Sequence, residues 1–424
     1  EYLVDLPARS RLRYASTDAL MYGGREPLTS GYSVTDVTDG ARLASVSTHY
    51  ITNPVKEHGS LRQSRDLVSV AMFPASDAAN DTTLYAESSA SRDTAIFVVN
   101  DNDSVADIEF DLLSLNGELT TANRTVEGHS QLSVYASDFT ESADFTGTIN
   151  IDSSHDVYVH SLLETDDGRG NRLMSPAPTT YVQGAVDDAA GAYVGDLMQA
   201  RRILPSIPTG AGSHVRVILL NPGSDTLSGT IEITDQPVIS YSVAPDRVFV
   251  HDIPSDARPL LGGIGIVRAE SGPAPEAFAL VSGIRRDGSV SSTHTVTSHQ
   301  EGTLFWAPLD TYPDVLHHGE IDVNLHVVNE KTIPATIYLE WFDIDGELVG
   351  KYERTFNVSD RASLSMEEVF GRSPIRGTLR VFSDSGVSVS LLETTRTVTD
   401  ELVIMDVPLQ STPSESRSRV VFPL

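Results

Sequence analysis

The sequence predicts an all-β protein made of tandem modules of about 115 residues, because one strand pattern recurs along the chain. The pattern is a small residue or glycine followed by apolar residues at alternate positions, which is typical of a strand leaving a turn. Repetition favours surface and assembly roles over a single catalytic site. The copies begin 117, 115 and 115 residues apart (147 − 30, 262 − 147, 377 − 262), at Ser30-Gly31-Tyr32-Ser33-Val34, Gly147-Thr148-Ile149-Asn150-Ile151, Gly262-Gly263-Ile264-Gly265-Ile266 and Gly377-Thr378-Leu379-Arg380-Val381.

A second repeated element is an apolar run that ends in asparagine and a polar cluster. This pattern predicts a buried strand followed by a turn, in which the asparagine side chain bonds nearby backbone groups. The three copies are Ile96-Phe97-Val98-Val99-Asn100, Val217-Ile218-Leu219-Leu220-Asn221 and Leu325-His326-Val327-Val328-Asn329.

Two modules also share the string Ser-Leu-Leu-Glu-Thr, at residues 161–165 and 390–394. The strings begin 14 and 13 residues after their glycines (161 − 147, 390 − 377). Successive strand residues point to opposite faces, so this difference of one residue shifts the inward and outward phase of the preceding strand. A bulge or a turn of different length is therefore expected.

An apolar-apolar-proline step recurs near each expected module boundary, at residues 72–74, 203–205, 306–308 and 421–423. Proline is confined to strand starts, edges and linkers, so these steps are predicted junctions. They divide the chain into the second half of a module (1–74), a module (75–182), a linker (183–202), two modules (203–307 and 308–410), and a tail or first strand of a further module (411–424). Charges at the ends of the linker complement a helix dipole and predict a helix there.

The repeat places both chain ends inside modules. The opening module lacks its front half, and Val421 and Phe422 match the beginning of a module. Two interpretations stay open. The chain is a piece of a longer repeat protein, or it is a processed subunit that offers its terminal strand to the open edge of a neighbour.

The repeated residues resemble the immunoglobulin-like β-sandwich repeats of large bacterial secreted and cell-surface proteins. The apolar run to asparagine, the hairpin Asp343-Ile344-Asp345-Gly346-Glu347 and the glycine-led strand carry the resemblance. Asn-Gly or Asp-Gly turns at 116–117, 287–288 and 345–346 indicate tight hairpins between short strands. The resemblance implies an extracellular stalk, adhesin, surface-layer or filament component.

The amino-acid composition of the chain limits the classes of partner and of metal site that it can have. The 424 residues carry a formal net charge of −29 and no cysteine. The acidity argues against a nucleic-acid partner, because affinity for nucleic acid depends on neutralising phosphates. The missing cysteines exclude disulfides and thiolate metal sites. The sequence has no run of about 18 apolar residues, so it predicts no membrane-spanning segment. An extracellular or cell-surface location is inferred from the resemblance.

No catalytic motif is present, so we expect no enzyme activity and no required cofactor. Calcium is the strongest metal hypothesis, because turns rich in carboxylates suit hard cations. Its candidate ligands are Asp101, Asp103, Asp166, Asp167, Asp343, Asp345 and Glu347. Hairpin geometry alone also explains the Asp-Gly turns. For assembly, the candidates are the alternating Arg9, Arg11 and Arg13, which would meet acidic surfaces, and the terminal Val421 and Phe422.

These observations predict a non-enzymatic extracellular structural protein that associates with itself, or with neighbouring modules of the same polypeptide, into a filament, layer or stalk. Two alternatives stay open. One is an adhesin or carbohydrate-binding array with a glycan or cell-surface partner, which would need exposed aromatic residues on one face; the only tryptophans are Trp306 and Trp341. The other is a set of accessory modules of a larger secreted enzyme.

Overall fold

The computed structural model describes residues 32–36, 46–55, 64–74, 78–140, 144–177, 179–181, 200–210, 212–253, 260–298, 301–310, 321–371, 375–396, 402–411 and 419–423. These residues form almost only β-strands, in several sheets, which confirms the all-β prediction. The helices among them are two short turns, η1 (Ala136–Asp138) and α2 (Met366–Phe370). Within those ranges, no helix has the length and apolar character needed to cross a membrane.

The strands fall into four groups, which we call units 1 to 4, and unit 3 shows the pattern most simply. Two four-stranded antiparallel sheets, in the orders β12-β17-β14-β15 and β16-β13-β18-β19, face each other across one core. Residues at alternate positions of each strand fill that core, for example Val217 and Leu219 in β13. The bounds are β12 (Arg201–Thr209), β13 (Ser213–Asn221), β14 (Leu227–Ile233), β15 (Ile239–Val243), β16 (Arg247–Ile253), β17 (Leu260–Ala269), β18 (Glu276–Ile284) and β19 (Val290–Thr297).

Units 2 and 4 repeat this strand order, except that one long strand serves both sheets. The first half of β9 pairs with β4 and β6, and its second half pairs with β5 and β10; β25 does the same in unit 4. Unit 2 contains β4 (Ala79–Ser88), β5 (Arg92–Asn100), β6 (Ala106–Ser114), β7 (Leu119–Val126), β8 (Ser130–Tyr135), β9 (Phe145–Asp166), β10 (Arg172–Pro176) and β11 (Thr179–Tyr181). Unit 4 contains β20 (Gly302–Asp310), β21 (Ile321–Val328), β22 (Ala335–Phe342), β23 (Leu348–Phe356), β24 (Arg361–Ser365), β25 (Arg376–Arg396), β26 (Leu402–Val407) and β27 (Gln410–Ser411).

Unit 1 is assembled from both ends of the chain. It contains β1 (Tyr32–Asp36), β2 (Val46–Val55), β3 (Ser64–Pro74) and the C-terminal strand β28 (Arg419–Pro423). Strand β28 pairs antiparallel with β1, with Val421 opposite Val34, as β12 pairs with β17 in unit 3. Val421 and Phe422 therefore pair with the first described strand of the same chain.

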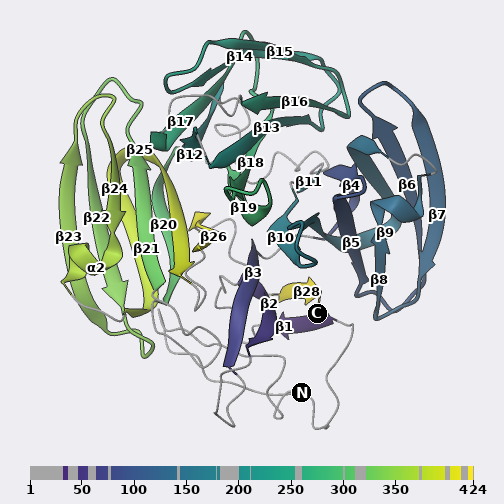
Figure 1. The fold of residues 1–424 in the computed structure, drawn as a ribbon, viewed down its shortest axis with the longest axis horizontal. Helices are drawn as coiled ribbons and strands as arrows, with labels where there is room; N and C mark the ends of the chain where they lie inside the picture. Colours follow the sequence, from purple (N-terminus) through teal and green to yellow (C-terminus); the bar gives the residue numbers. More distant parts are fainter. Residues whose placement is uncertain are drawn as a thin grey trace, which may run out of the picture.

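The four units surround a common axis (Figure 1). Strands β3, β10, β19 and β26, the last long strand of each unit, lie nearest the axis: β3 and β19 each lie beside both β10 and β26. Apolar side chains also connect neighbouring units. Tyr85 and Leu163 of unit 2 pack on Ile218 and Phe278 of unit 3, for example. The chain is thus closed into a ring by the pairing of β28 with β1.

The pairing register corrects the repeat in two places. Gly147 lies opposite Ser114, and Gly265 lies opposite Ile233. Gly377 comes just before Thr378, which lies opposite Phe342. The third copy of the glycine-led repeat therefore begins at Gly265 and not at Gly262. The proline step also differs: residues 203–205, 306–308 and 421–423 lie in the first strand of a unit, whereas residues 72–74 end β3, the last strand of unit 1. The apolar-apolar-proline match at residues 72–74 therefore lies in a strand that is not equivalent to the other three.

The other local predictions have different outcomes. Gly117, Gly288 and Gly346 have φ of 94°, 86° and 85° in the tight hairpins expected for them. The phase shift predicted for the strand before the two Ser-Leu-Leu-Glu-Thr strings is wrong: Val157 and Val159 lie in the core of unit 2, and Val387 and Val389 lie in the core of unit 4, at the same offsets of 10 and 12 residues from Gly147 and Gly377. The difference of one residue instead changes the face of the strings themselves, since Leu391 lies in the core of unit 4 whereas Leu162 packs between units 1 and 2. Most of the predicted helical linker lies outside the described residues, but its last two residues begin strand β12, so no helix reaches them.

Candidate functional site

The junction of units 2 and 3 holds a buried ion-pair network. Glu87 of β4 is 4% exposed and accepts hydrogen bonds from the Tyr85 hydroxyl and from Arg216 of β13. Arg92 approaches the other oxygen of Glu87 at 3.2 Å, and Arg216 Nε donates to Asp252 at 2.8 Å. Each buried charge therefore has an opposite partner, which is the condition for tolerating charges away from water.

The surroundings of Tyr85 and Arg216 shift the pKa values of both side chains upward. Burial, and then the charge of Glu87, raise the pKa of Tyr85 well above its usual value. Burial would lower the pKa of Arg216, but its bond to Asp252 and the charge of Glu87 outweigh burial and raise it. The tyrosine stays neutral and the arginine stays charged at any physiological pH, so the network is suited to joining units rather than to proton transfer.

Three carboxylates of like charge lie at the same junction. They are Asp81 of β4, Asp152 of β9 and Asp246 in the turn before β16. Burial raises the pKa of Asp81 and of Asp246, and the charge of Asp152 raises both further. This cluster opposes the junction at neutral pH, because like charges repel across it.

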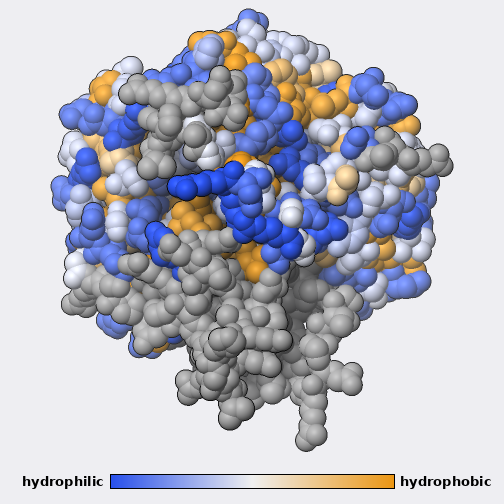
Figure 2. Space-filling model, in the orientation of Figure 1, coloured by the Kyte–Doolittle hydropathy of each residue, from blue (hydrophilic) through white to orange (hydrophobic). Residues whose placement is uncertain are grey.

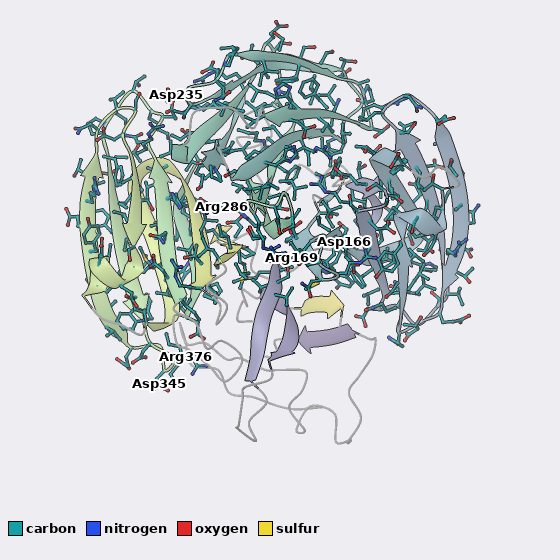
Figure 3. All side chains as sticks on the ribbon, viewed as in Figure 1. Asp166, Arg169, Asp235, Arg286, Asp345 and Arg376 are labelled. Atoms are coloured by element: carbon teal, nitrogen blue, oxygen red, sulfur yellow. The ribbon has the colours of Figure 1, made fainter. Side chains whose placement is uncertain are left out.

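Two hairpins near the ring axis form a second charged region. The β9–β10 turn contains Asp166, Asp167 and Arg169, and the β18–β19 turn contains Arg285 and Asp287. Arg169 Nη2 donates to Asp287 at 2.7 Å, and Arg285 lies 3.9 Å from Asp167. Figure 3 places Asp166, Arg169 and Arg286 near the middle of the ring, and Figure 2 shows strongly hydrophilic residues in the middle of the same face.

Asp167, one of the predicted calcium ligands, is used inside its own turn. Its Oδ1 accepts from the backbone nitrogens of Arg169 and Asn171 at 2.7 and 2.9 Å, and its Oδ2 accepts from Asn171 Nδ2 at 2.7 Å. Burial would raise the pKa of Asp167, but these hydrogen bonds and the charge of Arg285 outweigh burial and lower it. Its neighbour Asp166 caps the same turn by accepting from Gly168 N at 2.8 Å.

The other predicted calcium ligands stay in separate turns. Asp101 and Asp103 both approach the ring of His129, at 3.6 and 2.9 Å. Asp343 Oδ1 accepts from the backbone nitrogens of Asp345 and Glu347 at 3.0 and 2.9 Å, which stabilises the hairpin that the Asp-Gly turn predicted. Within the described ranges, no group of three or more His, Asp or Glu side chains is placed to hold a metal ion. Calcium binding by these turns stays a prediction.

The two tryptophans have different environments. Trp341 is 6% exposed and lies in the core of unit 4, with Nε1 donating to Arg376 O at 3.1 Å. Trp306 is half-buried on the outer face of the sheet formed by β23, β22, β25 and β20. There Arg380 lies over the Trp306 ring at 5.5 Å and over the Phe382 ring at 4.8 Å, and Tyr338 stacks on Phe382 at 4.8 Å.

This aromatic ladder bears on the glycan hypothesis. Sugar rings bind to aromatic faces that are open to solvent, but Arg380 and Tyr338 already stack on Phe382, and Arg380 covers Trp306. At least one face of each of these three rings is therefore occupied by another side chain of unit 4.

A half-buried aspartate with one buried carboxylate oxygen lies close to the ring axis. Asp406 of β26 accepts from the Thr297 hydroxyl of β19 at 3.2 Å, whereas its Oδ1 is buried and has no hydrogen-bond partner among the described residues. Burial raises the pKa of Asp406 to about 7, although the bonds from Thr297 lower it in part. Nothing in the local sequence pattern distinguishes Asp406 from a surface aspartate, so it was not among the predicted site residues.

The predicted site residues are therefore not brought together. The three acidic turns belong to separate hairpins, and Val421 lies in a strand that closes the ring. Arg9, Arg11 and Arg13 lie outside the described residues. The Glu87–Arg216 network was missed because its partners are 129 residues apart in sequence, and neither lies in a recognisable motif.

Comparisons with known proteins do not identify a family. No family model matches the chain, and no curated protein matches it. Among solved structures, the chain is similar to the crystal structure of dimeric latent PorU from Porphyromonas gingivalis, at 10% sequence identity, with 78% of this chain and 34% of that chain covered and a TM-score of 0.14. The chain thus spans about a third of the length of that protein, and a likeness this weak supports neither a shared fold nor a shared function.

Proposed function

We propose that the chain is a non-enzymatic structural part of an extracellular or cell-surface protein. In this proposal, the four units are immunoglobulin-like β-sandwich modules that form one closed scaffold, and scaffolds associate into a filament, layer or stalk. The observation that carries the proposal is the pairing of β28 with β1, which joins the two ends of the described chain into one body. The buried ion pairs between units support the same role, since they join units without leaving a free reactive group.

Exposed apolar residues supply contact points for association. We call the turn between the third and fourth strands of a unit its rim hairpin: residues 114–118 in unit 2, 234–238 in unit 3 and 343–347 in unit 4. Leu115 and Leu119 at the first rim hairpin are 51% and 60% exposed, and Val238 at the second is 64% exposed. Isolated exposed apolar residues are common, but their repetition at equivalent hairpins favours a contact role.

Electron microscopy and sedimentation of the purified protein test this proposal. We expect ordered polymers from the wild-type chain, and loss of polymers from the L115S/L119S variant with unchanged thermal unfolding. The matched control is V105S, which removes an apolar residue of 42% exposure outside the rim hairpins and should leave polymers intact. A chain that stays monomeric at every concentration would refute self-association, and specific binding to a glycan array would favour the adhesin instead.

A further inference from the structure

Strand β7 (Leu119–Val126) forms a free sheet edge on the outside of the ring (Figure 1). It pairs with β6 on one side, and no strand within the described ranges pairs with its other side. Six of its eight residues are exposed, all except Ala122 and Val126. A free, exposed edge presents backbone N–H and C=O groups that can pair with another extended chain.

The equivalent edges of units 3 and 4 have features that hinder such pairing, and β7 does not. Strand β15 has only five residues, and β23 carries Lys351, Glu353 and Arg354 and pairs with β22 through a register shift. Short length, charged side chains and irregular pairing each discourage the addition of a further strand. Strand β7 pairs with β6 over eight residues without a shift, contains no proline or lysine, and has Arg124 as its only charged residue. Of these three edges, β7 is therefore the one best suited to accept another strand.

The sheet face beside this edge is acidic. Alternate residues of β6, from Ala106 to Leu112, fill the core of unit 2, so the residues between them face away from that core: Asp107, Glu109 and Asp111. On the same face, Asp152 of β9 lies opposite Glu109, and Asp81 of β4 lies opposite Asp152. Within the described ranges, no arginine, lysine or histidine forms an ion pair with any of these five carboxylates. The Arg124 guanidinium lies on the other face, over the Phe139 ring of the unit 2 core at 5.0 Å.

The charge and geometry of this face define the partner. Neighbouring strands are about 5 Å apart, so a strand added to β7 would lie about 10 Å from β6. Lysine and arginine side chains at alternate positions of that strand would extend over Thr121, Asn123 and Thr125 of β7 and reach the carboxylates of β6. A second copy of the chain fits poorly, because its β7 edge brings the same acidic face and its formal net charge is −29.

We propose that β7 is a docking edge for an extended basic segment of another protein. The segment adds to the sheet as a strand next to β7, and its alternate lysine or arginine side chains pair with Asp107, Glu109 and Asp111. Backbone hydrogen bonds supply affinity, and the acidic face selects for positive charge. Docking of this kind goes beyond the structural role proposed above, because it does not require scaffolds to associate with each other.

Fluorescence anisotropy of a labelled peptide mixed with the full chain tests the proposal. The probe is a short peptide in which lysine alternates with threonine. The control peptide has the same sequence with its central backbone nitrogens methylated, which keeps the charge and blocks strand pairing. We expect the probe to bind at least about tenfold more tightly than the control, because backbone pairing carries the affinity of an added strand. Equal affinities, or no binding of either peptide, would overturn strand addition.

Substitutions in the chain then locate the peptide. Thr125 and Thr355 are equivalent exposed residues, since each directly precedes the residue that pairs with the first residue of the third strand of its unit. T125K on β7 should weaken binding of the probe about tenfold, because a lysine on the edge repels a basic strand. The matched control T355K on β23 should leave binding unchanged.

The acidic face is tested separately. D107N/E109Q removes two charges and should weaken binding of the probe about tenfold at low salt and reduce its salt dependence. Thermal unfolding of each variant should match that of the wild type, so that a loss of binding reports on the edge. Unchanged affinity in T125K or in D107N/E109Q would place the peptide elsewhere, and wild-type dimers that T125K dissociates would show that a second copy occupies the edge; either result overturns the proposal.

Discussion

At the scale of single residues, one buried asparagine fixes the same turn in three units. Asn329 Nδ2 donates to Ile333 O, Phe356 O and Asn357 O at 3.0 to 3.2 Å, and its Oδ1 accepts from Lys331 N at 3.1 Å. Asn100 and Asn221 make the equivalent bonds, and all three residues are fully buried. The side chain thereby ties the end of the second strand to the end of the fourth. The bonds with Lys331 and Ile333 confirm the predicted contacts with nearby backbone groups, whereas the tie to the fourth strand was not predicted.

Replacing Asn329 by alanine should cost about 1–3 kcal/mol of unfolding free energy, because several buried backbone groups lose their partner at once. Chemical denaturation monitored by circular dichroism measures the effect. N123A is the matched control, since Asn123 is exposed on β7. If N329A were as stable as N123A, the hydrogen bonds of Asn329 would not contribute to the stability of the fold.

Asp406 predicts a pH dependence near the ring axis. Burial raises its pKa to about 7, above about 3.9 for an aspartate in the unfolded chain, so the charged carboxylate destabilises the folded state at neutral pH. The contribution of Asp406 to the free energy of unfolding should therefore increase as pH falls from about 7 to about 4.

The D406N variant measures this effect, because its amide stays neutral across the range. We expect D406N to be more stable than wild type at pH 8, by at most about 4 kcal/mol, and the difference to vanish near pH 4. A difference that does not change with pH would show that Asp406 is already protonated or well solvated.

At the scale of elements, close backbone approach explains why the repeat carries glycine. A Cβ on Gly147 would lie 2.1 Å from Leu113 O, and one on Gly377 would lie 1.9 Å from Phe342 O. In both units, a backbone carbonyl at the end of the third strand therefore lies against the repeated glycine of the long strand. Gly265 differs, since the nearest atoms there belong to the flexible side chains of Ile207 and Leu204.

The G147A variant should lose about 1–3 kcal/mol, because a backbone carbonyl cannot move aside as a side chain can. The control is G272A: no atom lies within 4 Å of its added Cβ, so it isolates the cost of φ +72°. Thermal unfolding compares the two variants. A smaller loss in G147A than in G272A would contradict the steric argument.

The elements also show how far sequence alone reaches. Period-two alternation and the Asn-Gly and Asp-Gly turns act within a few residues of sequence, so strands and hairpins were predictable. The bonds from Asn329 to Phe356 and Asn357 cross 27 and 28 residues, and no local pattern encodes them. The register of the third repeat was not predictable, because three glycines within residues 262–265 offer several alignments and only pairing with Ile233 selects Gly265. The Glu87–Arg216 contact depends on how two units face each other, and no local pattern encodes that.

At the scale of the whole molecule, the offset of the repeat has a structural explanation. The strand that the repeat places at the start of a module, β28, pairs with β1, the first described strand of the chain. Five residues of β28 lie in antiparallel register with β1. This pairing covers one edge of β28 and one edge of β1, and unpaired strand edges favour uncontrolled pairing with other chains.

The central claim is that closure occurs within one chain, and a disulfide between V34C and V421C tests it most directly. Opposite residues in an antiparallel pair have Cα atoms about 4.5–5.5 Å apart, which suits a disulfide. The cysteine-free background leaves no competing thiol. We predict that oxidation at low protein concentration gives a crosslinked monomer, identified by intact mass and non-reducing gel mobility. A crosslinked dimer, or free thiols under the same conditions, would contradict closure of the ring within one chain.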